Sequence, residues 1–263
     1  MPAATSSRRW RTASDEKRTL AEHLRELRKR LVISAIAILV SMVAGYFLAP
    51  FVLDGLRAPI SQVAEDRSAE VVYTTVTAAF DLRLAISATI GIVIASPVWL
   101  YQLFAFLVPG LSSREKRYTF GFFFSAVPLF LGGAVSGWLV FPHMVELLTA
   151  FASQQDATFL DARTYYDFVI KLVLAVGVAF VLPVFLVLLN FLGVLSARAI
   201  LKGWRIAVLL ICLFTALATP AADIMSMFLL AVPMVVLYFA ATGVAAIHDR
   251  RLSRRLDALA SAA

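Results

Sequence analysis

The fold of this chain is decided where a charged helix runs directly into a long apolar segment. The charged part reads His23-Leu24-Arg25-Glu26-Leu27-Arg28-Lys29-Arg30-Leu31. An apolar run from Val32 to Phe51 follows it at once. A run of about 20 apolar residues is long enough for a helix to cross the hydrocarbon core of a membrane. The sequence therefore predicts an amphipathic helix that continues into a membrane-spanning helix.

The composition supports a membrane protein over a soluble one. Hydrophobic residues make up 61% of the 263 residues, and charged residues only 16%. A soluble domain of this length does not bury so much apolar surface, so the excess faces lipid. The net charge of +7 could suggest nucleic-acid binding, but the cations gather in short segments between apolar runs, which is typical of membrane topology. The single cysteine, Cys212, excludes an intrachain disulfide.

Six apolar runs are evident along the chain. They cover residues 31–51, 80–104, 118–141, 168–192, 206–218 and 224–246. The fifth run is too short to cross about 30 Å of hydrocarbon at 1.5 Å per residue, which predicts local thinning of the bilayer or shielding by neighbouring helices. The expected fold is an all-α integral membrane protein with six transmembrane helices, of which the fifth and sixth are short.

The distribution of lysine and arginine predicts the orientation. Most of these residues lie before the first run, in the second-to-third and fourth-to-fifth turns, and after the sixth run. Positive segments stay in the cytoplasm, so both termini are expected there. We divide the chain into a disordered basic tail (1–17), a six-helix membrane domain (18–247) and a basic cytoplasmic tail (248–263).

Prolines and glycines predict the shape of the bundle. Pro97, Pro128, Pro183 and Pro233 lie inside four of the runs and favour bent helices that form a curved shell. The spacing Gly133-x-x-x-Gly137 in the third run predicts close helix approach. The two longer outer loops, residues 50–79 and 142–167, are expected to hold short helices or caps over the bundle.

The sequence carries no recognisable catalytic set. None of the three histidines lies in the middle of an apolar run, and no Cys/His cluster, nucleophile elbow or phosphate-binding loop is present. We therefore predict no enzymatic activity, no catalytic residue, no cofactor and no metal. The rival from a different functional class is a small-solute permease or flippase. It would need a polar pathway at depth, which scattered serines, threonines and Asn190 do not form.

Two carboxylates stand out on the basic face, Glu26 before the first run and Glu115 before the third. Such groups suit a receptor for a positively charged peptide. Simpler explanations remain open for both. Glu26 is spaced to form a helix-surface ion pair with Arg30, and Ser112-x-x-Glu115 has the spacing of a helix capping box.

An ordered set of motifs resembles the TatC family, the signal-peptide receptor subunit of the twin-arginine protein translocase. The set comprises the motif at 23–30, Leu56-Arg57-Ala58-Pro59, the stretch Pro97 to Leu111, Glu115-Lys116-Arg117, Phe141-Pro142, Pro183-Val184, and Asp223 through Ala231-Val232-Pro233-Met234. The resemblance covers roughly residues 18 to 245, with matching topology.

The resemblance implies roles for individual residues. Glu26 and Glu115 match the two cytoplasmic glutamates that bind the consecutive arginines of a signal peptide. The further positions of the signal-peptide site are Phe106, Pro109, Leu27 and Arg28, and the partner or structural positions are Pro59, Pro183 and Asp223. A guanidinium fork binds a carboxylate through two parallel bonds, and lysine would lose that fork.

The resemblance also implies the biological setting. The expected function is Sec-independent translocation of folded proteins across the cytoplasmic (inner) membrane, drawing on the proton-motive force. The expected partners are twin-arginine signal peptides, TatA- and TatB-type single-span proteins and the lipid bilayer, without nucleic acid; self-oligomerisation is left open. The chain departs from many family members in 179–183, which lacks an acid before Pro183, and in the turn around Pro220 and Asp223.

Overall fold

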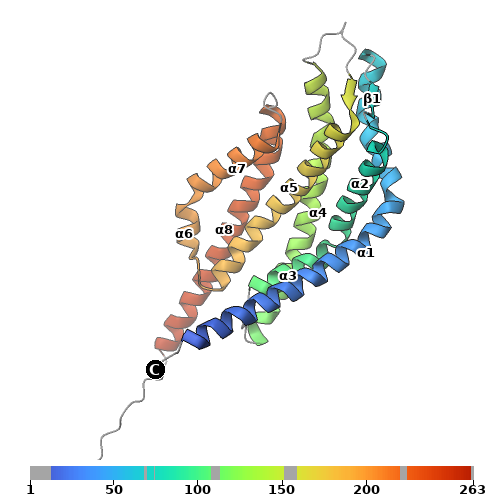
Figure 1. Ribbon diagram of the computed structural model, residues 1–263. Helices are drawn as coiled ribbons and strands as arrows, with labels where there is room; N and C mark the ends of the chain where they lie inside the picture. Colours follow the sequence, from blue (N-terminus) through green and yellow to red (C-terminus); the bar gives the residue numbers. More distant parts are fainter. Residues whose placement is uncertain are drawn as a thin grey trace, which may run out of the picture.

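The computed structural model describes residues 13–67, 70–73, 75–107, 113–150, 159–219 and 224–261. Its elements follow in the order α1 (Ala13–Arg67), β1 (Glu70–Val72), α2 (Ala78–Ile94), α3 (Ser96–Leu107), α4 (Ser113–Ala150), β2 (Phe159–Asp161), α5 (Ala162–Phe191), α6 (Ala197–Lys202), α7 (Trp204–Ala218) and α8 (Ile224–Ala260). Figure 1 shows these helices as a curved assembly in which α5 runs between α4 and α8. The predicted all-helical membrane fold is confirmed.

The predicted apolar runs correspond to three kinds of helix. In the described part of the chain, α1, α4, α5 and α8 are each long and apolar enough to cross a membrane. The second run is divided between α2 and α3. These two helices are long and apolar enough to cross a membrane only when taken together, and the angle between them is 58°. The fifth run forms α7, a helix of 15 residues that is short as expected. The count of six spans stays a prediction.

The prediction of a short sixth helix is wrong. Helix α8 has 37 residues and continues well beyond the apolar run, through the basic segment to Ala260. Alanine, leucine and arginine, which dominate residues 250–260, are all strong helix formers. Hydropathy marks where a helix leaves the apolar layer, and it does not mark where the helix ends.

The long outer loops are also more regular than expected. Helix α1 has 55 residues and runs on to Arg67, and α4 runs on to Ala150, so much of both loops is an extension of a membrane helix. Beyond these extensions, β1 and β2 pair in parallel, with Val71 opposite Leu160. Backbone pairing between two distant loops is not visible in hydropathy, because it depends on where the helices place the loop ends.

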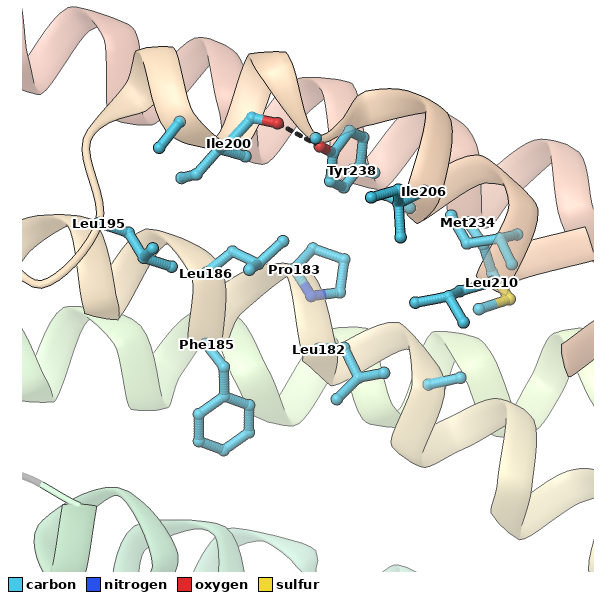
Figure 2. A pocket seen from close by; sticks show the side chains of 15 residues that line it. Leu182, Pro183, Phe185, Leu186, Leu195, Ile200, Ile206, Leu210, Met234 and Tyr238 are labelled. Atoms are coloured by element: carbon cyan, nitrogen blue, oxygen red, sulfur yellow. Dashed lines mark hydrogen bonds between the residues drawn. The ribbon is translucent and has the colours of Figure 1, made fainter.

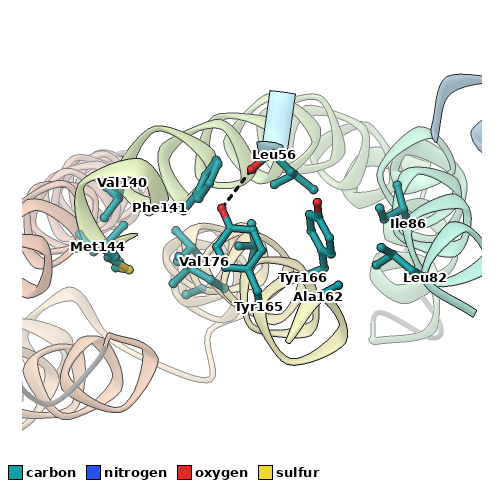
Figure 3. Packing of buried hydrophobic residues seen from close by; sticks show 14 of the residues in the cluster. Leu56, Leu82, Ile86, Val140, Phe141, Met144, Ala162, Tyr165, Tyr166 and Val176 are labelled. Carbon is teal, nitrogen blue, oxygen red and sulfur yellow. Dashed lines mark hydrogen bonds between the residues drawn. The ribbon is translucent and has the colours of Figure 1, made fainter. Parts of the chain in front are cut away.

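Helix α5 is the centre of the packing. Its side chains pack with those of α1, α2 and α4 in one buried cluster, of which Figure 3 shows Leu56, Ile86, Phe141 and Tyr166. The Tyr165 hydroxyl in this cluster donates to the Leu56 carbonyl over 3.1 Å. A second cluster joins α3, α4 and α5 nearer the other end of the bundle. Helix α1 is peripheral by contrast, since only 6% of the residues in its most apolar segment are buried.

Candidate functional site

The candidate site lies where α1 passes α3, around the half-buried carboxylate of Glu26. The Arg30 guanidinium donates through Nε to Glu26 Oε1 over 3.0 Å and through Nη2 to the same oxygen over 2.5 Å. Its third nitrogen, Nη1, donates to Gln102 Oε1 on α3 over 3.2 Å. One guanidinium therefore joins the predicted carboxylate to the neighbouring helix.

An aromatic contact closes the site on one side. The rings of His23 on α1 and Phe106 on α3 stack with centroids 4.5 Å apart and planes 23° apart. His23 thus packs against the ring that the family resemblance assigned to the signal-peptide site. This contact and the Arg30 bridge hold α1 against α3 at two neighbouring points.

A small cavity of about 150 Å³ lies beside the ion pair. Its lining consists of Leu27, Arg30, Leu31, Ser34, Trp99, Gln102, Leu103 and Phe106. A partly buried carboxylate next to an apolar hollow suits a ligand that carries both a cation and an apolar side chain. In the described residues, no group of three or more histidine, cysteine, aspartate or glutamate side chains is placed to hold a metal ion.

The break between α2 and α3 positions two of the lining residues. Pro97 has no backbone N–H, so an uninterrupted helix would lack a hydrogen bond here, and α3 instead restarts at Ser96. The Trp99 indole Nε1 donates to the Ile92 carbonyl over 3.0 Å, across the break. This bond and the amides of Val98 and Trp99, which both donate to the Ala95 carbonyl, fix the direction in which α3 carries Gln102 and Phe106.

The predicted site residues are brought together only in part. Leu27 and Phe106 line the cavity, and Glu26 is joined to it through Arg30, whereas the Arg28 side chain is exposed and does not line it. Glu115 lies in the first turn of α4, but its side chain is outside the described part of the structure. The pairing of the two glutamates is therefore a prediction that no contact tests.

Four further predicted positions lie elsewhere. Pro109 and Asp223 fall outside the described residues, and Pro59 belongs to α1 without a described side chain. Pro183 is buried in α5, where it lines a different cavity from the one beside Glu26.

Sequence reasoning missed Gln102 as a member of the site. Its signal was available, since Gln102 carries an amide in the predominantly apolar α3, where a polar side chain needs a partner. The pairing of Arg30 with Glu26 had been recognised only as the simpler explanation for Glu26. The structure shows that this pair exists and that it also reaches α3.

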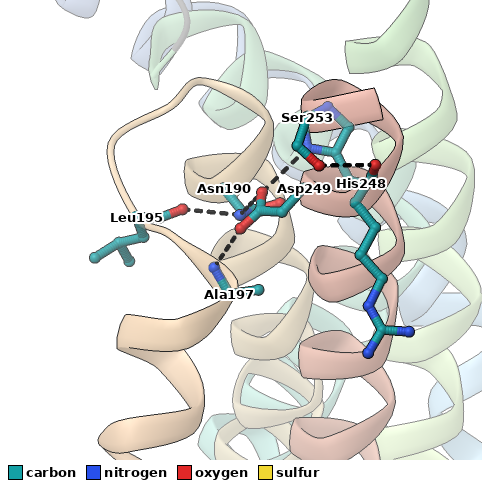
Figure 4. Close-up of polar contacts among 7 residues, drawn as sticks. Asn190, Leu195, Ala197, His248, Asp249 and Ser253 are labelled. Carbon is teal, nitrogen blue, oxygen red and sulfur yellow. Dashed lines mark hydrogen bonds and ion pairs between the residues drawn. The ribbon is translucent and has the colours of Figure 1, made fainter. Parts of the chain in front are cut away.

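A second polar cluster joins α5, α6 and α8 (Figure 4). Asp249 on α8 accepts a hydrogen bond from the backbone N–H of Ala197 over 2.7 Å and another from Asn190 Nδ2 over 2.9 Å. Asn190 Nδ2 also donates to the Leu195 carbonyl over 2.8 Å. The neighbouring His248 ring stacks on Phe191, with centroids 3.9 Å apart. These contacts tie the α5–α6 turn to α8, which is a structural role.

A larger cavity among the described residues is apolar. It measures about 520 Å³ and lies between α5, α6, α7 and α8 (Figure 2). Leu182, Pro183, Leu186 and Met234 are among its lining residues. The Tyr238 hydroxyl at its edge donates to the Ile200 carbonyl over 2.6 Å and so does not offer a free polar group to the cavity. The lining of this cavity is therefore almost entirely apolar.

Comparison with known proteins points to one family. Residues 22–233 match the family model described as Sec-independent protein translocase protein (TatC). The chain is 43% identical over 238 residues to the TatC protein of Xylanimonas cellulosilytica, covering 90% of this chain and 86% of that one. It is 39% identical to the TatC protein of Rothia mucilaginosa, covering 92% and 83%. A crystal structure of the twin arginine translocase receptor TatC in DDM superposes with a TM-score of 0.72 at 31% identity, covering 85% of this chain and 99% of that chain.

Proposed function

Since the chain belongs to the TatC family of Sec-independent protein translocase proteins, we propose that it is the receptor that binds twin-arginine signal peptides. The binding site is the α1–α3 surface around Glu26. The observation that carries this proposal is the partly buried Glu26 carboxylate, which already holds one guanidinium beside a hollow lined by Leu27 and Phe106.

The chemistry of the site favours arginine over lysine. A guanidinium offers several N–H donors in one plane, so it can hold a carboxylate and a second acceptor at the same time. Arg30 does so with Glu26 and Gln102. An ammonium is a compact, strongly hydrated point charge and cannot reproduce this planar arrangement. A peptide arginine would therefore gain more from this surface than a peptide lysine.

Glu115 supplies the second carboxylate of the proposed site. It lies in the first turn of α4, where a negative side chain is favoured by the exposed amides of the helix N-terminus. A capping role and a binding role are compatible there. The second arginine of the signal peptide binds Glu115, and Pro109 and Phe106 shape the space between the two carboxylates.

The setting of the receptor follows from the same proposal. The protein lies in the cytoplasmic membrane with both termini in the cytoplasm, and it nucleates assembly with TatA- and TatB-type single-span proteins. Helix α7 spans only about 22 Å at 1.5 Å per residue, less than the roughly 30 Å hydrocarbon core. The bilayer beside α7 is therefore thinned, which favours this side for the single-span partners.

The test is site-specific photo-crosslinking to a twin-arginine precursor, in membranes, from position 103, which lines the cavity and leaves both glutamates in place. The same precursor with both arginines changed to lysine is run in parallel. We expect a crosslink with the arginine pair only, and we expect Glu26→Gln to remove it. Glu22→Gln, one turn earlier on the exposed surface of α1, is the matched control and keeps the crosslink. Equal crosslinks to both precursors would contradict the proposal.

A further inference from the structure

The carboxylate proposed to receive a signal-peptide arginine is already occupied by an arginine of the same chain. Arg30 directs two of its three nitrogen atoms to Glu26 Oε1. The Arg30 side chain is 23% exposed and that of Glu26 is 39% exposed, so the ion pair is partly buried but can be reached from solvent. A sheltered pair with two hydrogen bonds is stronger than a freely exposed ion pair.

A guanidinium that binds a carboxylate through two parallel bonds uses both oxygens, so an incoming guanidinium competes with Arg30 for Glu26 Oε1. Binding of a peptide cation is then an exchange, in which the free energy of the new pair is reduced by that of the resident pair. The third nitrogen of Arg30 makes the exchange feasible, because Nη1 already donates to Gln102 Oε1 over 3.2 Å. Arg30 can leave Glu26 and retain a partner on α3, so it is not left as an unpaired charge.

We propose that Arg30 is an internal competitor that sets the affinity of the site for cationic peptides. This inference rests on the proposed function. In the free protein the Arg30 guanidinium is bound to the Glu26 carboxylate. When a signal peptide binds, Arg30 leaves Glu26 and stays bound to Gln102. The competitor weakens every cationic ligand by the same factor, so a ligand with weak contacts falls below the affinity needed for stable capture. A twin-arginine peptide, with its stronger contacts, stays above it.

A competitor makes a prediction opposite to that of a positioning residue. If Arg30 only oriented Glu26, a substitution that weakens the Arg30–Glu26 ion pair would also weaken peptide binding. If Arg30 competes, peptide affinity rises in the order Arg30, Arg30→Lys, Arg30→Gln, because the resident pair weakens in that order. The expected gain for Arg30→Gln is about three- to tenfold, the range for one partly sheltered ion pair. The ratio of twin-arginine to twin-lysine affinity stays the same, because both peptides are relieved of the same competitor.

The experiment measures dissociation constants for a fluorescent twin-arginine signal peptide and its twin-lysine counterpart on the purified full chain in detergent. The proteins are the unmodified chain, Arg30→Lys, Arg30→Gln and, as a charge-matched control, Arg25→Gln, whose side chain is exposed one residue before Glu26. Thermal unfolding of each variant checks its fold, and if Arg30→Gln fails to fold, Arg30→Lys decides the matter.

The outcomes separate the two proposals. Tighter binding of both peptides by the Arg30 variants, with Arg25→Gln unchanged or weaker, supports the competitor. Unchanged or weaker binding by the Arg30 variants overturns it, even where the unmodified chain prefers the arginine pair. Failure of the unmodified chain to prefer arginine over lysine would instead refute the proposed receptor function.

Discussion

Polar side chains inside the apolar helices are largely used to satisfy the backbone of their own helix. Hydroxyl groups donate to the carbonyl four residues earlier at Ser34, Ser87, Thr89, Ser125, Ser136, Thr215, Thr219 and Thr242. In hydrocarbon this is the inexpensive way to carry a hydroxyl, since water is not available as a partner. Serines and threonines with this geometry do not make a polar pathway through the bundle, which weighs against the permease alternative.

The Trp99 indole forms a hydrogen bond that links α3 to α2 across the helix break. We therefore expect the loss of this donor to destabilise the protein. Trp99→Phe keeps an aromatic ring but removes the donor to the Ile92 carbonyl. The expected cost is about 1 kcal/mol, which lowers the unfolding temperature in detergent by about 2–4 °C. Trp204→Phe, at a half-exposed position on α7, is the control. Equal unfolding temperatures for the two variants would show that the bond across the break is dispensable.

Neighbouring helices in this protein approach each other closely at several glycines. A Cβ atom added at Gly133 on α4 would lie 2.8 Å from the Val176 carbonyl oxygen and 2.9 Å from Gly177 Cα on α5. The predicted close approach in the third run is therefore confirmed. A second such contact joins α1 to α2, where Gly45 faces the Ser87 carbonyl and Gly91 faces the backbone of Met42. Without a hydrophobic force between helices in lipid, such contacts supply much of the association.

Two adjacent glycines provide a matched test of this packing. Gly133→Ala forces α4 and α5 apart, and we expect a loss of about 1–3 kcal/mol in stability. A Cβ at Gly132 meets nothing within 4 Å, so Gly132→Ala should be neutral or stabilising, since alanine favours the helix. Thermal unfolding in detergent compares the two. Similar changes in stability for the two variants would mean that the contact between α4 and α5 does not govern position 133.

The Asp249 cluster ties the turn between α5 and α6 to α8, and its removal should loosen that turn. Asp249→Ala deletes the acceptor for the Ala197 amide and for Asn190. We expect a cost of about 1–3 kcal/mol and faster trypsin cleavage after Arg198 and Lys202, whose side chains are exposed.

The matched control for this cluster is Asp257→Ala. Asp257 is also on α8, and its side chain is exposed. Its trypsin digestion should follow that of the unmodified chain. If Asp249→Ala were digested no faster than Asp257→Ala, the turn would not depend on the cluster.

At the scale of the whole molecule, the start of α1 and the end of α8 lie at the same end of the bundle (Figure 1). The strands β1 and β2 pair with each other at the opposite end of the bundle (Figure 1). This arrangement agrees with a chain that crosses the membrane an even number of times. The positive charge near both termini predicts that their end faces the cytoplasm.

Cysteine labelling tests this orientation directly. In a Cys212→Ser background, Val76→Cys lies in the fully exposed turn before α2, and Leu252→Cys lies half-exposed near the end of α8. In intact cells a membrane-impermeant maleimide should label position 76 and spare position 252. After permeabilisation both should be labelled. Labelling of position 252 in intact cells would reverse the predicted topology.

Much of the membrane architecture could be predicted from the order of residues alone. The positions of the apolar helices, the short α7 and the break near Pro97 depend on hydropathy and on the missing N–H of proline, which are local properties. Glu26 stood out for a similarly local reason, as a carboxylate on a basic surface. Hydropathy did not predict the ends of α1, α4 and α8, because each of these helices continues beyond its apolar part.

The tertiary structure alone decided which side chains meet. Gln102 lies 72 residues from Arg30, and Asp249 lies 59 residues from Asn190, so the local pattern can mark a polar residue but cannot identify its partner. Each contact depends on the rotation of two helices about their axes, and the contact of Gln102 with Arg30 depends also on the 58° bend between α2 and α3. Partition into lipid does not determine these rotations, because an apolar helix can face the bilayer with any side. They are set by packing between helices, and that packing places an arginine of the chain on the carboxylate that the sequence had singled out.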